Sequence, residues 1–404
     1  FFFMSVSRET TRDLLLKAHE RFDIEYGGFL SNHMTHGLMA LDMLGASSER
    51  LASWFQEYIK HDVNGSQLEP AQSPGDLTID ENNWNQFKGK RENFPELYEF
   101  FKKQAESATE QEIVNKFISD LAPGVAGSAL HPMIHLGFSI AFSDSNVPFA
   151  EGLAYMTHSF LPLLDYSLFE SNSTPEDSQK DLKAIVVDIR NDDGLWNLMR
   201  NTKETGFQSK LKLLQDSVSL LGHLSKWNVL HSNTSSEEEE QQVFEAACKE
   251  LAQTAVFAFY YTKPPCTEFF LLHGVTGCYA AICIASMITN HEQRMKVLFH
   301  FAAAFLATFI VEGSPDCITG STDADHPISP TNDWQAIVDQ VLQENTDRND
   351  VHMIKLIYVC KRFSEMYGED PLWVNAAGCL TLSSILDTSD YDFAIGISQE
   401  PNPR

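Results

Sequence analysis

The sequence has few basic residues for its number of acidic ones. It contains 29 lysines and arginines against 56 aspartates and glutamates, which gives a formal net charge of −27 over 404 residues. Non-specific binding to nucleic acid and docking on anionic membranes both need clustered positive charge. We therefore expect no nucleic-acid partner and no membrane partner. Because 43% of the residues are hydrophobic and 11% are aromatic, the chain is also not a disordered acidic segment.

Cysteine is missing from the first half of the chain. The seven cysteines begin at Cys248, and none of them forms a Cys-x-x-Cys pair. An odd number scattered through apolar stretches predicts reduced thiols in a core, which suits a reducing compartment. The N-terminus has no pattern of a secretory signal, because Phe1, Phe2 and Phe3 are followed at once by Met4 and polar residues. We predict a cytoplasmic protein.

Several common catalytic motifs are absent. The sequence has no strand-linked GxGxxG, no Walker loop, no G-x-S-x-G nucleophile elbow and no His-Glu-x-x-His. A nucleotide-binding fold and a serine hydrolase therefore have no support.

Strand-like alternation is nearly absent, and helical periods account for most of the chain. The pattern predicts helices after an N-cap at Ser7 and at about 32–44, 51–59, 95–121, 149–166, 181–200, 207–229, 237–262, 333–345, 350–367 and 371–386. Polar loops are expected at 61–80 and 313–331. We predict an all-α protein, a single large domain over residues 1–404 with its core at about 22–386, in which central buried helices surround a histidine-lined pocket.

Two apolar stretches, 269–288 and 297–311, raise the question of a membrane hairpin. The first is long enough to span a bilayer, but it contains His273 and has no basic cluster beside it. The second is too short. We expect both to be buried helices of the core.

Histidine is the residue type that points to chemistry. His33 and His36 are three residues apart, and His131 and His135 are four apart, so each pair lies on one helical face. Three more, His158, His273 and His352, lie in other apolar segments. Each buried imidazole needs partners for both ring nitrogens, and a shared metal ion would meet that need. A metal-free polar pocket with histidines as proton-transfer groups is the alternative.

The type of metal is not fixed by the ligands alone, since imidazole suits Zn, Cu, Fe or Ni. Lys355 lies three residues after His352 among apolar neighbours. Burial lowers the pKa of a lysine and frees a neutral amine. That amine can react with carbon dioxide to give a carbamate, which would supply an anionic ligand. A lysine that reaches solvent or pairs with an acid is the other interpretation.

Five segments together resemble the questin oxidase-like family, whose fungal members serve aromatic polyketide pathways. The segments are FLSNHMTH at 29–36, HPMIHLGF at 131–138, VPFAEGLAYMTH at 147–158, FFLLH at 269–273 and HMIKL at 352–356. The resemblance implies a multihelical fold and oxidative ring opening of an anthraquinone, with a Baeyer–Villiger-like outcome and no flavin-binding fold. It also implies non-haem iron held by histidines and a carboxylated lysine.

We assign one imidazole from each facing helix to the metal. The predicted ligands are His33, His135, His273, His352 and Lys355. The predicted proton-transfer groups are His36, His131 and His158.

The function predicted from the sequence is an oxygen-dependent oxidoreductase that cleaves or hydroxylates an aromatic, quinone-like substrate. Its partners would be a small aromatic molecule and dioxygen. Two alternatives remain: a metal-free enzyme of the same fold that uses NADPH and oxygen, and a non-catalytic helical protein that binds an aromatic ligand.

Overall fold

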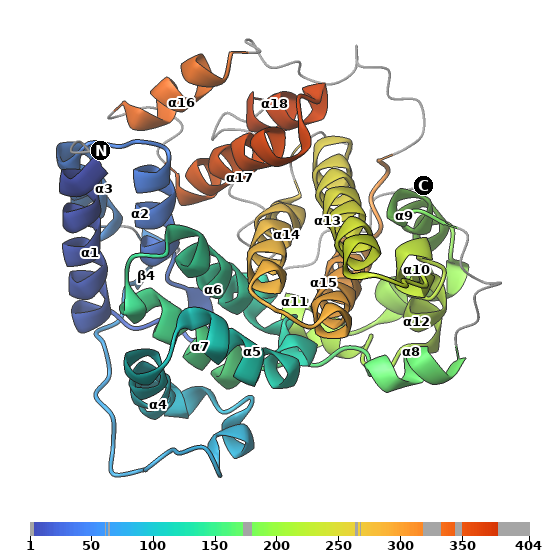
Figure 1. Cartoon of the computed structure of the whole chain (residues 1–404), viewed down its shortest axis with the longest axis horizontal. Coiled ribbons are helices and arrows are strands. Elements are labelled where there is room, and N and C mark those ends of the chain that lie inside the picture. Colours follow the sequence, from blue (N-terminus) through green and yellow to red (C-terminus); the bar gives the residue numbers. More distant parts are fainter. Residues whose placement is uncertain are drawn as a thin grey trace.

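The computed structural model describes residues 4–60, 62–63, 65–172, 180–262, 266, 268–317, 333–343 and 350–378. Within these residues the chain is mostly helical with very few strand residues (Figure 1), as the sequence predicts. The first helices are α1 (Met4–Arg21), α2 (Met34–Met43), α3 (Ser48–Tyr58), α4 (Phe94–Ser107), α5 (Glu110–Leu121), α6 (His131–Phe142) and α7 (Asn146–His158). Those that follow are α8 (Tyr166–Asn172), α9 (Leu182–Arg190), α10 (Asp193–Asn201), α11 (Phe207–Lys212), α12 (Val218–Leu224) and α13 (Glu237–Tyr260). The last are α14 (Phe269–Ser286), α15 (His291–Val311), α16 (Trp334–Leu342), α17 (Val351–Tyr367) and α18 (Pro371–Gly378).

The remaining elements are short. β1 (Glu25–Tyr26) pairs with β2 (Leu30–Ser31), and β3 (Asp62–Val63) pairs with β4 (Ser66–Gln67), both antiparallel. The turn between β1 and β2 contains Gly27 and Gly28 at φ 59° and 84°, a left-handed conformation that favours glycine. The 3₁₀ turns are η1 (Trp84–Phe87), η2 (Arg91–Asn93), η3 (Ala122–Gly124), η4 (Gly127–Leu130) and η6 (Asn228–His231).

Helix boundaries differ from the predicted ones in several places. The segment 95–121 forms two helices, because Thr109 caps α5 with reciprocal hydrogen bonds to Glu112. Likewise 181–200 and 207–229 each form two helices, and the predicted loop at 61–80 contains the β3–β4 hairpin. The predicted N-cap at Ser7 is wrong, since α1 includes that residue. Most of 313–331, and the part of 371–386 after Gly378, lie outside the described residues.

Helix α6 lies at the centre of the fold. It packs against α2, α7 and α14, and α17 packs against both α2 and α14, which brings the two ends of the chain into one domain. Close approach depends on glycine: a Cβ at Gly137 of α6 would lie 2.3 Å from Ala280 Cα in α14. A Cβ at Gly152 of α7 would lie 2.7 Å from Leu136 Cα in α6. Three helices that carry histidines are therefore held at short range.

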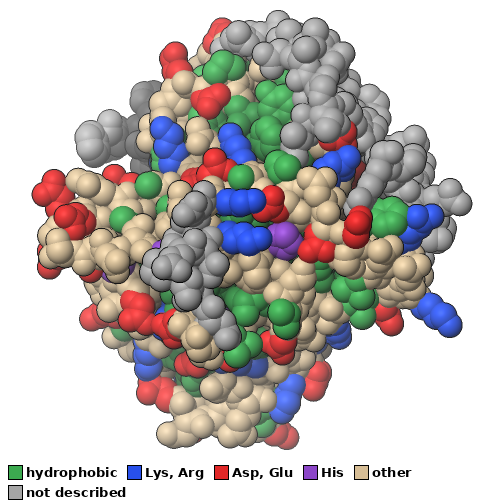
Figure 2. All heavy atoms as spheres, turned by 90° about the vertical axis from the view of Figure 1, so that its right-hand side faces the viewer, with side chains coloured by type: hydrophobic (Ala, Val, Ile, Leu, Met, Phe, Trp, Pro, Cys, Tyr) green, Lys and Arg blue, Asp and Glu red, His purple; other side chains and the backbone are tan. Residues whose placement is uncertain are grey.

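The two apolar helices α14 and α15 are interior. Both are long and apolar enough to cross a membrane, but 83% and 89% of their most apolar windows are buried inside the protein. This burial is what the core helices of a water-soluble protein show. Acidic side chains are instead spread over the outer surface, as the face in Figure 2 illustrates.

Cysteine usage differs in one place from the prediction of reduced thiols. Five cysteines, at 248, 278, 283, 317 and 360, are free, and four of these are buried. Cys266, in contrast, is disulfide-bonded. The spacing of the cysteines in the sequence did not predict this disulfide bond.

Candidate active site

His131 begins α6, and a strained turn positions it. Ser128, Ala129 and Leu130 all have left-handed φ values of 42°, 52° and 69°, which cost free energy for residues other than glycine. The turn directs the carbonyl of Ser128 at His131, 2.5 Å from Nδ1. Because a carbonyl only accepts, Nδ1 carries the proton and Nε2 keeps its lone pair.

The side chain of Ser128 is held from the opposite direction. Its hydroxyl donates to Glu25 Oε1 at 2.8 Å and accepts from Arg91 Nη2 at 2.8 Å. Arg91 also forms an ion pair with Glu25 at 2.5 Å, so the β1 strand and η2 fix this turn together. The strain is thus offset by hydrogen bonds to charged groups, which are stronger than neutral ones.

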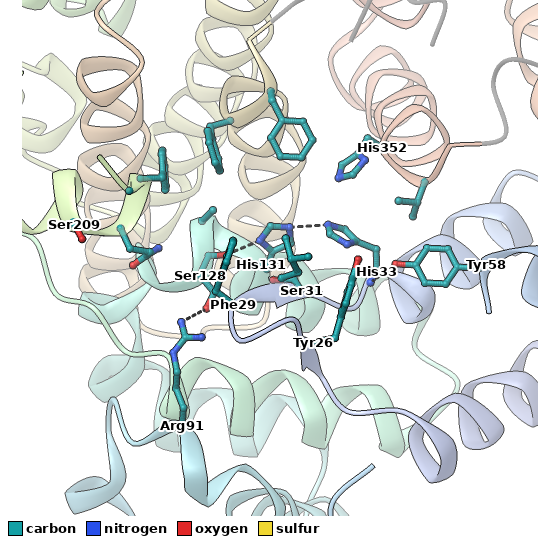
Figure 3. A pocket seen from close by; sticks show the side chains of 18 residues that line it. Tyr26, Phe29, Ser31, His33, Tyr58, Arg91, Ser128, His131, Ser209 and His352 are labelled. Carbon is teal, nitrogen blue, oxygen red and sulfur yellow. Dashed lines mark hydrogen bonds between the residues drawn. The ribbon is translucent and has the colours of Figure 1, made fainter. Parts of the chain in front are cut away.

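His33 lies just before α2 and faces His131. Its backbone N–H donates to the Tyr58 hydroxyl at 2.9 Å, and its Nε2 lies 2.7 Å from Nε2 of His131 (Figure 3).

His273 and His352 complete a group of four imidazoles, which we call the histidine cluster: His33, His131, His273 and His352. His273 Nδ1 donates to the carbonyl of Phe269 at 2.9 Å, and its Nε2 has no hydrogen-bond partner among the described residues. His352 Nδ1 lies 3.0 Å from Asp350 Oδ1. The ring of His352 is centred 4.7 Å from that of His33 and 5.2 Å from that of His273.

The geometry of three of these residues suits a metal ion. One ring nitrogen each from His33, His131 and His273 lies within 4.8 Å of the other two, and all three residues are buried. Burial, together with the nearby charge of Lys355 and of neighbouring histidines, holds the pKa of each well below its usual value. The imidazoles are therefore neutral at physiological pH, which is the form that binds metals.

A second group, His36, His135 and Lys355, lies deeper. The rings of His36 and His135 are centred 4.9 Å apart, and His36 is 5.8 Å from His33 by the same measure. His135 Nε2 is 3.1 Å from Glu151 Oε2. Within the described chain, both nitrogens of His36, Nδ1 of His135 and Nζ of Lys355 have no hydrogen-bond partner. Burial lowers the pKa of Lys355 to about 7, so a large share of its amine is neutral.

His158 is placed apart from the cluster. Its Nδ1 donates to the carbonyl of Tyr155 at 3.3 Å, and its Nε2 lies 3.6 Å from Glu25 Oε2. It is linked to the site through Glu25 and through Tyr155, whose ring packs on both His158 and His135. The structure therefore brings together seven of the eight predicted site residues and leaves His158 at the edge.

An aromatic pocket opens onto the cluster. It has a volume of about 290 Å³, and its walls include His33, His131 and His352. Its aromatic lining comprises Tyr26, Phe29, Tyr58, Phe207, Phe269 and Phe270. Phe207 and Phe270 stack with ring centres 3.8 Å apart and an interplanar angle of 12°. Arg91 and Ser128 add polar groups to the lining, and Ser128 lies beside His131 (Figure 3).

Sequence reasoning missed the acidic and hydroxyl partners. Glu25, Arg91 and Ser128 carry no pattern that links residues so far apart in the chain. Glu151 could have been identified from the sequence, because it is an acidic residue within the otherwise apolar segment that forms α7. In the structure this residue is 5% exposed. Buried acids are paired, so a histidine partner could have been expected.

The chain is similar to known proteins over most of its length. The family model described as questin oxidase-like matches residues 30–360, which include every member of the histidine cluster. A Baeyer–Villiger oxidase of Pestalotiopsis microspora is 24% identical over 392 residues, which cover 90% of this chain and 82% of that protein. With the family model matching most of its length, this chain is an oxidoreductase that belongs to the questin oxidase-like family.

Proposed function

We propose that this protein is an oxygen-dependent oxidase that cleaves or hydroxylates a flat aromatic, quinone-like substrate in the pocket beside the histidine cluster. The observation that carries the proposal is the position of His33, His131 and His352 in the wall of an aromatic pocket. A planar apolar ring fits such walls, and burial there excludes water. The Baeyer–Villiger oxidase that the chain resembles supports the same reaction class.

Non-haem iron fits the residues present. Hydrogen bonds fix the protons of His131 and His273 on Nδ1, which leaves both Nε2 atoms as ligands. With His33 they form a compact three-nitrogen set. His131 thus takes the place that the sequence assigned to His135, whose Nε2 is bonded to Glu151. When bound there, iron would supply the redox chemistry that dioxygen needs to react with an organic molecule.

Lys355 is proposed as the source of an anionic ligand. Its amine is fully buried and has no hydrogen-bond partner in the described part of the chain. A neutral amine adds to carbon dioxide to form a carbamate and releases one proton. The carbamate would place a negative charge beside histidines that cannot supply one, and a fully buried cation would be costly without a partner.

The other groups of the pocket would bind and orient the substrate. The stacked rings of Phe207 and Phe270 offer a flat surface, while Arg91 and Ser128 offer hydrogen bonds to oxygen substituents. Insertion of one oxygen atom beside a carbonyl reduces the other to water and consumes two electrons and two protons. A reduced nicotinamide such as NADPH would supply the electrons.

Oxygen uptake tests the proposal. The full chain, purified without chelator and supplied with iron(II), is mixed with a dihydroxyanthraquinone, with and without NADPH. We expect uptake by the wild type and a loss of about 100-fold or more in His131→Ala. The matched control is His300→Asn, because His300 is also buried but packs against Tyr166 and Phe299. Binding of the anthraquinone without oxygen uptake under either condition would instead indicate a ligand-binding protein.

A further inference from the structure

A second cavity reaches Glu151, the hydrogen-bond partner of His135 in the deep group. It has a volume of about 230 Å³ and shares no lining residue with the aromatic pocket. Its walls come from α1, α4 and the segment 71–74, and they include His19 and Glu151. His19 is 24% exposed in its side chain, whereas Glu151 is 7% exposed. The cavity therefore gives solvent access to one end of a buried carboxylate.

Hydrogen bonds continue from this cavity toward the interior. His19 Nδ1 lies 2.8 Å from Glu151 Oε1, and Glu151 Oε2 lies 3.1 Å from His135 Nε2. The His135 ring also packs against His36, with ring centres 4.9 Å apart. Each oxygen of the carboxylate thus contacts a different imidazole, one near solvent and one fully buried.

The inner end of this route has ring nitrogens without hydrogen-bond partners. These are Nδ1 of His135 and both nitrogens of His36, among the described residues. Burial by itself would raise the pKa of Glu151, but the bonds from His135 and His19 outweigh it and lower the pKa to about 2. For His19, burial lowers the pKa and the contact with Glu151 raises it by more. Glu151 therefore remains an anion that can accept a proton from His19.

We propose that His19, Glu151 and His135 conduct protons from the second cavity to the buried histidines, separately from the aromatic pocket. Their catalytic use rests on the proposed oxidase function, whose reduction of oxygen to water consumes protons. The His19 imidazolium first gives a proton to Oε1 of the Glu151 carboxylate, and water in the cavity recharges His19. Glu151 then passes a proton from Oε2 to the facing nitrogen of His135, whose other ring nitrogen releases its proton inward. A flip of the His135 ring then resets the path.

The groups around His19 leave it free to exchange protons. Tyr98 of α4 packs on it with ring centres 4.1 Å apart, and burial raises the pKa of that phenol, which therefore stays neutral. Lys102 and Glu99, also of α4, act on the pKa of His19 in opposite directions. On α1 and the following turn, Glu20 and Asp23 also line the cavity.

Deuterium exchange at the ring N–H of His135, followed by nitrogen-15 NMR of the metal-free full chain, tests the path without requiring turnover. We expect His19→Ala to slow exchange by about 100-fold, the scale of a positioned proton-transfer group. Imidazole in the buffer should restore it, because the second cavity is open at the vacated ring. Glu151→Gln should slow exchange equally and resist imidazole, since an amide cannot pass a proton on.

The matched control is His223→Ala. His223 Nε2 contacts Asp192 Oδ2 at the same 2.8 Å, but this pair is bonded to Ser219 and not to the deep histidines. Exchange at His135 should be unchanged in this variant. The proposal is overturned if His19→Ala exchanges as fast as the wild type, or is slow and gains nothing from imidazole. Failure of the oxidase function would appear separately, as intact exchange effects in a protein that takes up no oxygen.

Discussion

The proton on Nδ1 is fixed in the histidines around the site by partners that differ in kind. Ser128 and Phe269 use backbone carbonyls, whereas Asp350 uses its carboxylate for His352. The common result is that Nε2 is the atom left to face the centre. Histidine spacing predicted which residues converge. The orientation of each ring depends on backbone atoms that no side-chain pattern records, so spacing alone could not distinguish the roles of His131 and His135.

Lys355 is the residue whose replacement separates the models best. If its carbamate is a ligand, Lys355→Ala should lose bound metal and oxygen uptake together, and Lys355→Glu should restore part of both by supplying a carboxylate. The measurements are metal content per chain and the rate of oxygen uptake.

Lys361→Ala is the control for this substitution, because Lys361 lies on the same helix but is 37% exposed and pairs with Glu365. Exposed pairs contribute little, so this variant should behave as the wild type. Full metal content and full uptake in Lys355→Ala would rule out the carbamate.

At the scale of elements, the site depends on how closely α6 approaches its neighbours. His131 and His135 belong to α6 and His273 belongs to α14, and the two helices meet where Gly137 faces Ala280. A displacement of α6 would therefore increase the distances between the imidazole rings of the site. Sequence reasoning placed α14 by its long apolar run, but for α6 it gave only the shared helical face of His131 and His135, without bounds. It did not predict which helices pack against each other. A glycine in a helix permits close approach of a neighbour, but the sequence does not show which neighbour that is.

Gly137→Ala tests this dependence. The new methyl group would meet backbone atoms of Ala280, including its carbonyl oxygen at 2.8 Å, which cannot move aside as a side chain can. We expect the free energy of unfolding to fall by about 1–3 kcal/mol, as for other overpacked cores, measured by chemical denaturation. Metal content should fall with it.

Gly222→Ala is the matched control, because a Cβ at this exposed position of α12 would meet nothing within 4 Å. This change should raise the free energy of unfolding by about 0.5–1 kcal/mol, since alanine favours a helix over glycine. Equal effects of the two substitutions would mean that the approach of α6 to α14 does not limit the fold.

At the scale of the whole molecule, the sequence was most informative about the fold class. Helical period predicted an all-α domain, the two apolar stretches were expected inside it as α14 and α15, and both helices are buried. Helix ends were predicted less well. The hydrophobic spacing continues across Thr109, whereas the N-cap that Thr109 forms begins a new helix there.

The interior position of α14 and α15 predicts the behaviour of the protein with membranes. After a carbonate wash of a cell lysate, we expect the full chain in the supernatant, because its apolar helices already bury their side chains against each other. Retention in the washed membrane pellet would favour the membrane hairpin instead.

Metal analysis tests the central claim most directly. The full chain, purified without chelator and exposed to iron(II) under nitrogen, is desalted and analysed by inductively coupled plasma mass spectrometry. An imidazole site of this kind should retain about one iron per chain. The iron should be lost in His131→Ala and kept in His223→Ala. A wild type that retains no transition metal, yet consumes oxygen with a dihydroxyanthraquinone and NADPH, would contradict the iron site.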